Sequence, residues 1–258
     1  MKKYNGEKLI VSLTSFGERF EYAAIVIKHL LDTQDYKDFH LVLTVYKEDF
    51  GKLTDSIKDL VYSDRIELLT AEENLGPHLK YFYSMLKYRD LPIVTIDDDR
   101  FHSTNMLSKL VEKYENSIIR GVISHCAPVI SRTRDVIDPL ERWCVPWRRL
   151  HPNCISFLAM AEGFAGVLYP PNCFKDLNNE IPEIRKYLYH DDIFLRALEI
   201  KNKIPVIQCD AVYERDVLGK DIREAQTYKM EKTHDAGNAY RNSIISKLNS
   251  KLLEGFYL

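Results

Sequence analysis

The sequence predicts an α/β fold in which a mostly parallel sheet carries helices on both faces, with a mixed sheet in its second half. Three observations support this prediction. Strand-like apolar runs alternate with amphipathic helical stretches through the first hundred residues, one such run ends in three carboxylates, and the pattern changes from about Gly121. Strand, helix, strand, helix in this order is typical of parallel sheets covered on both faces. In open sheets of this kind ligands bind beyond the carboxyl ends of the strands, so a site is expected there.

The first half contains four apolar runs that predict buried strands. They lie at residues 8–13, 40–46, 65–70 and 91–96. Between the first two, residues 19–31 place their apolar side chains on one helical face. Ser15 and Glu18 have the spacing of a capping box at the start of this helix. A second helix is expected between the next two strands, and Pro77 stands where the first turn of a third helix accepts proline.

The second half has shorter strand-like runs and a loop rich in Arg, Trp and Pro at residues 131–152. The runs lie at residues 121–131, 153–171 and 203–209. Residues 238–253 have the apolar spacing of a terminal helix. We therefore expect one domain over residues 1–237, with halves of about 1–120 and 121–237, followed by a helical tail at 238–258.

The composition limits the classes of function. The 258 residues are 45% hydrophobic, which suffices for a substantial core. With 36 basic and 38 acidic residues, the formal net charge is -2. This balance gives no overall field that would attract nucleic acid, so none is expected as a partner. Any binding of phosphate must depend on local groups.

The cysteines and the N-terminus indicate the compartment. The five cysteines are odd in number and show no CxxC pair, which favours free thiols in a reducing compartment. They are Cys126, Cys144, Cys154, Cys173 and Cys209. The start of the chain lacks the apolar run of a signal peptide, and no later run is long enough to span a membrane. A cytoplasmic protein is therefore expected.

The run that ends at Ile96 continues directly into Asp97, Asp98 and Asp99. Adjacent carboxylates repel one another and raise one another's pKa, so a positive partner is expected beside them. A divalent cation fits, because Mg²⁺ or Mn²⁺ is held by one or two carboxylates while substrate phosphates complete its coordination. A solvated acidic loop is the alternative that remains open.

Two further signals come later in the chain. Asp191 and Asp192 follow His190 and precede an apolar run of helical period, so they lie at a helix N-terminus. Capping and the helix dipole explain one acidic residue, whereas a pair opposite a metal site suggests a catalytic base. His234 is either a surface residue or a further metal ligand, in a set that suits manganese.

In combination these features resemble the GT-A-type nucleotide-sugar glycosyltransferases. The matching motifs are VSLTSFGERF as a first-strand nucleotide loop, ENLGPHLKYF, TIDDDR as the DxD motif, the acceptor-side strand EGFAGVLYPP, HDDIFLRA at the place of the xED motif, and a C-terminal His. The resemblance covers most of the chain, and the order and spacing of the motifs are its specific part. It points to small bacterial transferases that build surface polysaccharide or lipo-oligosaccharide. Asp191 departs from the family, which has Glu at this place.

The resemblance implies a role for each matched residue, with residues 1–120 as the nucleotide-binding half and 121–237 as the acceptor half. The expected contacts to the nucleotide sugar are Thr14, Ser15, Phe16, Arg19, Asn74, Lys80, Asp97 and Asp98. The expected metal ligands are Asp97, Asp99 and His234. Asp192 matches the catalytic base, with Asp191 as its neighbour in the catalytic pair. For Asn74 the alternative is a turn formed with Gly76.

For the acceptor, Trp143, Trp147, Arg142 and Arg148 are suited to stack on a sugar and to donate hydrogen bonds to it. Packing or an interface is the equal alternative for such a cluster. The tail places an apolar stripe beside Arg241, Lys247 and Lys251, which suggests peripheral contact with the inner face of the membrane or a homo-oligomer. Packing of this stripe on the main domain is the alternative.

The implied activity is a metal-dependent transfer of a hexosyl or N-acetylhexosaminyl group from a UDP-sugar to a hydroxyl of a saccharide or lipid-linked glycan, with inversion. The cofactor would be Mn²⁺ or Mg²⁺. Three alternatives remain: a retaining glycosyltransferase of the same fold, a nucleotidyltransferase that makes nucleotide sugars, and a non-catalytic binding module. A nucleotidyltransferase normally has a glycine-rich loop after its first strand, whereas LTSFGERF has one glycine.

Overall fold

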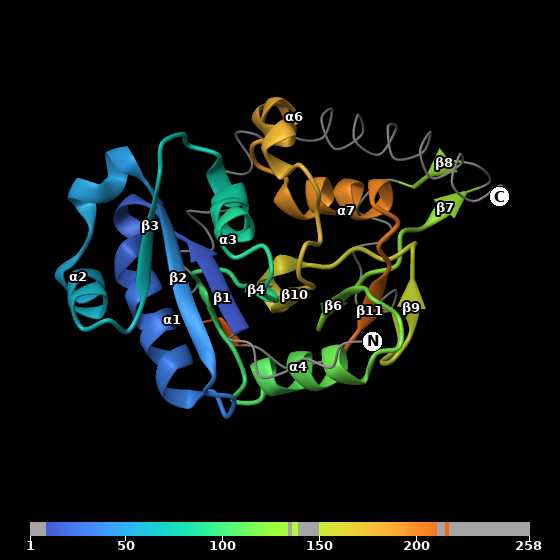
Figure 1. Cartoon of the computed structure of the whole chain (residues 1–258), viewed down its shortest axis with the longest axis horizontal. Coiled ribbons are helices and arrows are strands. Elements are labelled where there is room, and N and C mark those ends of the chain that lie inside the picture. Colours follow the sequence, from blue (N-terminus) through green and yellow to red (C-terminus); the bar gives the residue numbers. More distant parts are fainter. Residues whose placement is uncertain (1–8, 134–135, 139–149, 211–214, 217–258) are drawn as a thin grey trace.

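The computed structural model describes residues 9–133, 136–138, 150–210 and 215–216. The strands of its main sheet are β1 (Leu9–Thr14), β2 (Phe39–Tyr46), β3 (Glu67–Ala71), β4 (Ile93–Thr95), β6 (Val122–Ser124), β9 (Ile155–Ser156), β10 (Val167–Tyr169) and β11 (Val206–Gln208). Their order across the sheet is β3-β2-β1-β4-β10-β6-β11-β9 (Figure 1). Two short ribbons stand apart from it. They pair β5 (Arg100–Phe101) with β12 (Arg215–Asp216), and β7 (Arg132–Thr133) with β8 (Val136–Ile137).

The sheet is parallel in its first half and mixed in its second, as the sequence predicts. β1 pairs in parallel with β2 and with β4, and β2 pairs in parallel with β3. β10 is antiparallel to both of its neighbours, β4 and β6. Beyond it, β11 is parallel to β6, and β9 is antiparallel to β11.

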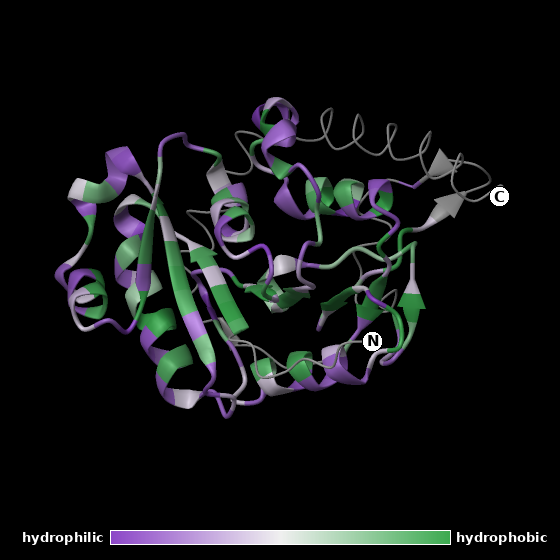
Figure 2. Ribbon diagram, viewed as in Figure 1, coloured by the Kyte–Doolittle hydropathy of each residue, from purple (hydrophilic) through white to green (hydrophobic). Residues whose placement is uncertain are grey.

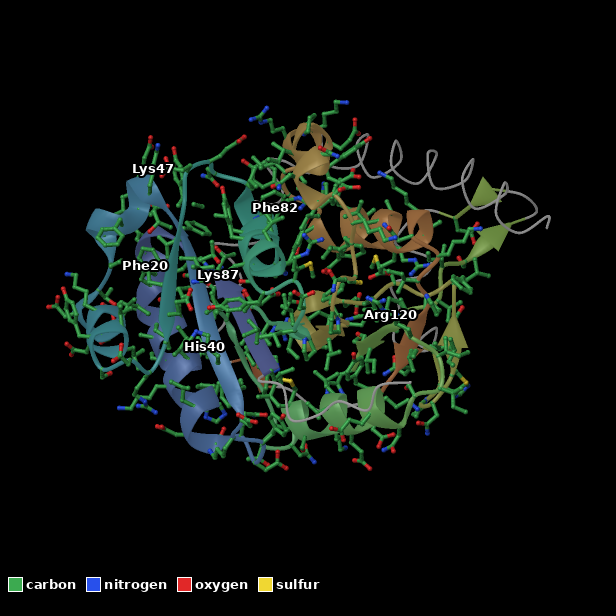
Figure 3. The ribbon with its side chains drawn as sticks, in the orientation of Figure 1. Phe20, His40, Lys47, Phe82, Lys87 and Arg120 are labelled. Atoms are coloured by element: carbon green, nitrogen blue, oxygen red, sulfur yellow. The ribbon has the colours of Figure 1, made fainter. Side chains whose placement is uncertain are left out.

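Helices cover both faces of the sheet. The helices α1 (Phe20–Thr33), α2 (Asp55–Tyr62) and α4 (Met106–Asn116) pack in one hydrophobic cluster with the sheet, while α3 (Phe82–Lys87), α6 (Ile181–Lys186) and α7 (Asp191–Lys201) pack on the other face. Figure 3 labels Phe20 on α1 and Phe82 on α3, one from each face.

The strand residues explain these two layers. Side chains alternate between the faces of a strand, so Leu9, Val11 and Leu13 join the α1 cluster while Ile10 joins the opposite face. Both faces of β1 are therefore buried, as expected for a central parallel strand, although Ser12 and Thr14 make the face of Ile10 partly polar. Figure 2 shows hydrophobic residues gathered on the strands and on the inner sides of the helices.

Several local expectations are wrong. The 3₁₀ turn η1 (Gly17–Arg19) precedes α1, and among the described residues no side chain caps either element, so the capping box of Ser15 and Glu18 is absent. The helix expected after Pro77 is divided into the 3₁₀ turn η3 (Gly76–Lys80) and α3. The sequence reading also missed α4 and α6.

Other expectations concern the chain as a whole. Among the described cysteines, Cys126, Cys154, Cys173 and Cys209 are free thiols. None of the helices in the described ranges combines the length and the apolar composition that crossing a bilayer requires. The expected tail at 238–258 lies outside the described residues.

Candidate active site

The strand order brings three loops to one edge of the sheet. β1 and β4 are parallel neighbours, so the residues that follow Thr14 and those that follow Thr95 emerge side by side. β10 runs the opposite way, with Val167 paired to Thr95. The residues just before β10, the 3₁₀ turn η5 (Gly163–Ala165), therefore arrive at the same edge. This edge holds the acidic residues that the sequence singled out.

Arg19 is the first positive partner of the acidic loop. Its Nε donates to Asp98 Oδ2 at 2.9 Å, its second guanidinium nitrogen pairs with Asp98 Oδ1, and the same nitrogen lies 3.2 Å from Asp99 Oδ2. Burial raises the pKa of Asp98 above its usual value, and the hydrogen bond and charge of Arg19 oppose this rise. The middle carboxylate is thus committed to a buried ion pair.

Lys80 is the second positive partner, and it joins the two acidic groups. Its Nζ lies 2.7 Å from Asp97 Oδ1 and 2.7 Å from Asp191 Oδ2, and its side chain is 6% exposed. Burial alone would lower the pKa of Lys80, but the charges of Asp191 and Asp97 raise it well above its usual value. Burial likewise opposes ionisation of Asp191, yet the charge of Lys80 lowers the pKa of Asp191 overall. Asp191 is therefore a fixed anion.

Asp192 has a different environment, although it is adjacent in sequence. Burial and the charge of Asp191 raise the pKa of Asp192 well above its usual value. The Gly163 amide donates to Asp192 Oδ1 at 3.1 Å. A Cβ on Gly163 would lie 2.9 Å from both Asp192 Oδ1 and Lys80 Nζ, so a side chain here would force these two groups to shift. The two carboxyls of the pair thus differ in both partner and pKa.

The residues expected at the nucleotide lie around the end of β1. The Thr14 hydroxyl donates to the Thr44 carbonyl at 2.8 Å, and Ser15 is buried. Phe16 is 53% exposed, and its ring centroid lies 5.8 Å from the Arg19 guanidinium carbon. An exposed aromatic ring beside a cation is a surface on which a base can stack.

Asn74 forms the turn that the sequence left as an alternative. Its Oδ1 accepts a hydrogen bond from the Gly76 amide at 2.9 Å, and Gly76 has φ of +56°. The Asn74 side chain therefore shapes the entry into η3.

The donor set of the acidic loop fits a divalent metal. The Asp97 and Asp99 side chains are 32% and 20% exposed, and carboxylate oxygens are the ligands that Mg²⁺ and Mn²⁺ prefer. Within the described residues, no three His, Cys, Asp or Glu side chains form a group that could hold a metal ion. The third expected ligand, His234, lies outside the described residues. Two protein carboxylates with substrate phosphates are a sufficient set for Mg²⁺.

The expected acceptor residues Trp143, Trp147, Arg142 and Arg148 also lie outside the described residues. The sequence reading missed two residues at the site. Gly163 was seen only as part of a glycine-containing strand, and His78 was not singled out. The His78 imidazole is buried, and its Nε2 lies 2.9 Å from the Tyr187 carbonyl. For His78 the available signal in the sequence was the alternation of Gly76, His78 and Lys80.

Comparisons with known proteins place the chain among distant structural neighbours. No family model matches the chain, and no curated protein matches it in sequence. Glucosyl-3-phosphoglycerate synthase from Mycobacterium tuberculosis, in complex with Mn²⁺, UDP and phosphoglyceric acid, matches at 15% identity over 45% of this chain and 42% of that chain, with a TM-score of 0.34. S. aureus TarS 1-349 in complex with UDP matches at 13% identity over 80% of this chain and 59% of that chain, with a TM-score of 0.47.

The inositol-1-phosphate CTP transferase from T. maritima matches at 10% identity over 89% of this chain and 98% of that chain, with a TM-score of 0.46. The matched region is about half of the length of the synthase and of TarS. At these identities and TM-scores the likeness is distant and assigns no activity to this chain.

Proposed function

We propose that the chain is a glycosyltransferase that moves a sugar from a nucleotide sugar, preferably a UDP-sugar, to a hydroxyl of a saccharide or lipid-linked glycan. The observation that carries the proposal is the convergence of two acidic groups from opposite halves of the chain on Lys80. Its ammonium lies 2.7 Å from both Asp97 and Asp191. In such a transferase the diphosphate site and the catalytic base lie on opposite sides of the transferred sugar. The contact of Lys80 with both Asp97 and Asp191 supports the proposal, because it brings the acidic loop and the Asp191–Asp192 pair to one place.

The donor would bind at the end of β1. In this proposal Phe16 stacks on the base or ribose, Arg19 faces the diphosphate, and Thr14, Ser15 and Asn74 line the nucleotide. The exposure of Phe16 and its proximity to Arg19 support this placement. Asp98 acts through Arg19, since its carboxylate holds the guanidinium. Lys80 and Asp97 complete the donor side.

Asp97, Asp99 and His234 would hold Mn²⁺ or Mg²⁺. When bound, the ion acts as a Lewis acid that stabilises the negative charge of the departing diphosphate. The two partly exposed carboxylates of the loop support this assignment.

Asp192 is the base in this proposal, and Asp191 is its fixed neighbour. As the bond between the anomeric carbon and the diphosphate breaks, the acceptor oxygen forms the new bond from the opposite face, and its proton passes to Asp192. A single displacement of this kind inverts the anomeric centre. Burial and the charge of Asp191 raise the pKa of Asp192, and this supports the role because a higher pKa makes the ionised carboxylate a stronger base.

The proposal is tested by incubating the protein with UDP-, GDP- and CMP-sugars, with Mn²⁺ or with EDTA. Metal-dependent release of the nucleoside diphosphate, increased by a saccharide acceptor, is the expected result. Release of pyrophosphate from UTP and a sugar 1-phosphate would show a nucleotidyltransferase instead. NMR of the product decides between inversion and retention, and binding of the donor without turnover would show a binding module.

The acceptor site and the role of the tail are two separate proposals. We propose that Trp143, Trp147 and Arg148 contact the acceptor and that the tail at 238–258 docks on a membrane surface or on a second copy of the chain. The cationic and apolar residues of the tail sequence support the second proposal. If a chain that ends at Gly237 keeps its liposome binding and its oligomeric state, the docking proposal is wrong.

A further inference from the structure

The 3₁₀ turn η3 and the loop before it make four contacts with α6, with the turn after α6 and with the start of α7. The first joins the Glu73 carboxylate to Arg185, with Nε at 2.5 Å and the terminal nitrogen at 2.8 Å. This pair is largely exposed and contributes little. The other three contacts are deeper, and alternate residues of η3 make them: Gly76, His78 and Lys80.

Gly76 and Lys80 make the outer two of these three contacts. A Cβ on Gly76 would lie 2.8 Å from the Leu188 carbonyl oxygen, so the two backbones approach more closely than a side chain would allow. The Lys80 ammonium lies 2.7 Å from Asp191 Oδ2. η3 therefore contacts the chain at Leu188, before the Asp191–Asp192 pair, and at Asp191 itself.

His78 makes the central contact and is fully buried. Its Nε2 lies 2.9 Å from the Tyr187 carbonyl, which only accepts hydrogen bonds, so Nε2 carries a proton and donates. Its Nδ1 lies 2.7 Å from the Tyr81 hydroxyl, which is then the donor to the ring. Burial lowers the pKa of His78, which favours this neutral form. The ring also packs edge-on against Phe194 of α7, with centroids 5.3 Å apart.

We propose that His78 is a positioning residue for the Asp191–Asp192 pair. It holds the Tyr187 carbonyl, which also accepts from the His190 amide at 3.2 Å, and so fixes the turn from which α7 begins. The start of α7 in turn sets where Asp191 meets Lys80 and where Asp192 meets Gly163. The catalytic consequence rests on the proposed function, whereas the effect on the turn does not.

The test compares His78→Leu with His78→Gln. Leucine fills the space but cannot donate to Tyr187, whereas the glutamine amide can. In His78→Leu we expect a loss of turnover of about tenfold or more and a smaller rise in the KM for the donor, because Arg19 keeps its contact with the acidic loop while Lys80 can shift with Asp191. Hydrogen exchange at the His190 and Phe194 amides should be about tenfold faster or more, because the turn opens more often. His78→Gln should have turnover and exchange rates close to those of the wild type. Tyr81→Phe should lower turnover and speed exchange, but by less than His78→Leu.

Ile57→Ala is the matched control, because Ile57 is fully buried in α2, in the cluster on the opposite face of the sheet. It should leave exchange at His190 and Phe194 as in the wild type. Three results would each overturn the proposal. His78→Leu could exchange at the wild-type rate, Ile57→Ala could speed exchange as much as His78→Leu does, or His78→Leu could exchange faster with unchanged turnover. If the wild type transfers no sugar, the proposed function fails, and the exchange rates alone decide whether His78 positions the turn. If His78→Leu does not fold, the comparison of His78→Gln with Tyr81→Phe decides.

Discussion

The Asp192 carboxyl is subject to two opposing influences. Burial and the charge of Asp191 raise its pKa, while the charge of Lys80 and the hydrogen bond from the Gly163 amide lower it, and the rise is the larger effect. Asp192→Asn keeps the shape and removes the proton acceptor, so we expect transfer to fall by roughly 10²- to 10⁴-fold. Affinity for UDP, measured by calorimetry, should hardly change. Asp191→Asn is the control and should reduce transfer less. If Asp191→Asn reduces transfer more than Asp192→Asn does, Asp191 is the base and Asp192 its neighbour.

The same residue gives the transfer rate a pH dependence. A raised pKa keeps Asp192 protonated to higher pH, and only the ionised form can accept the proton of the acceptor. The rate should therefore rise as the pH passes upward through this raised pKa and should be lost below it. A pH profile of kcat checks this, and Asp192→Asn should lack the rising limb. A wild-type pH profile with the same shape as that of Asp192→Asn would contradict the assignment.

Gly163 offers a steric test at the same place. A Cβ there would lie 2.9 Å from Asp192 Oδ1 and 2.9 Å from Lys80 Nζ, so Gly163→Ala must displace one of them. Since displacements of about 1 Å at a site cost on the order of a hundredfold in rate, we expect a loss of that size. Gly51→Ala is the matched control, because a Cβ on Gly51 meets nothing within 4 Å. Equal transfer rates in the two variants would show that Gly163 is not constrained.

At the scale of the elements, β2, β3 and α3 are joined by Glu67. Its carboxylate accepts from Lys87 Nζ at 2.5 Å, pairs with His40 Nε2 at 2.7 Å, and accepts from the Tyr88 hydroxyl. His40 and Lys87 are labelled in Figure 3. Burial opposes ionisation, yet these hydrogen bonds lower the pKa of Glu67 from 4.5 to about 2. The stabilisation is therefore present above about pH 4.5 and is lost as the pH falls through about 2.

Glu67→Gln tests this network. The pKa shift corresponds to about 3 kcal/mol at most, and screening by solvent reduces the expected loss of unfolding free energy to about 1–2 kcal/mol at neutral pH. Urea unfolding at neutral and at strongly acidic pH measures the difference, which should vanish in acid. Glu72→Gln is the control, because its exposed pair with Lys47 should contribute little. A loss that persists in acid would show that packing rather than charge is responsible.

Sequence periodicity predicts elements better than it predicts their neighbours. The apolar runs at β1, β2, β3 and β4 are long enough to locate each strand within about two residues, because buried parallel strands have few polar interruptions. α4 was missed because its apolar positions are mixed with charged ones over only three turns. The antiparallel insertion of β10 between β4 and β6 depends on contacts distant in sequence, which no local pattern contains.

At the scale of the whole molecule, donor and metal should bind together. Arg19 and Lys80 are shared among Asp97, Asp98, Asp99 and Asp191, so these groups keep a net negative charge that repels the diphosphate. We therefore expect UDP to bind weakly in EDTA. With Mn²⁺, a ligand at a hundred times its Kd stabilises by about 2.7 kcal/mol, which corresponds to a rise in Tm of roughly 5–10 °C for a chain of this size. Asp99→Asn should lose the Mn²⁺-dependent part. Equal UDP affinity in Mn²⁺ and in EDTA would refute the metal bridge.

The positions of the acidic groups could be predicted from the sequence, but their partners could not. Asp97–Asp99 follow a strand and Asp191–Asp192 begin α7, as expected. The sequence reading assigned Lys80 to the donor, whereas its described partners are Asp97 and Asp191. Such pairing requires the three-dimensional arrangement, because one side chain reaches residues from both halves of the chain. The same holds for the contact of Gly163 with Asp192.

The place of β10 also bears on the order in which the protein folds. Strands β1 to β4 are contiguous in the chain and pair only with one another until β10 joins the free edge of β4. A chain emerging from the ribosome can therefore assemble β1 to β4 early, while β4 remains an open strand edge until Tyr169 has been synthesised. During that interval the exposed edge can pair with other chains, and its closure requires a contact across more than seventy residues, which forms slowly. β3 stays at the edge of the sheet, and of β1, β2 and β4 the strand that carries the acidic loop is the last to gain both of its neighbours.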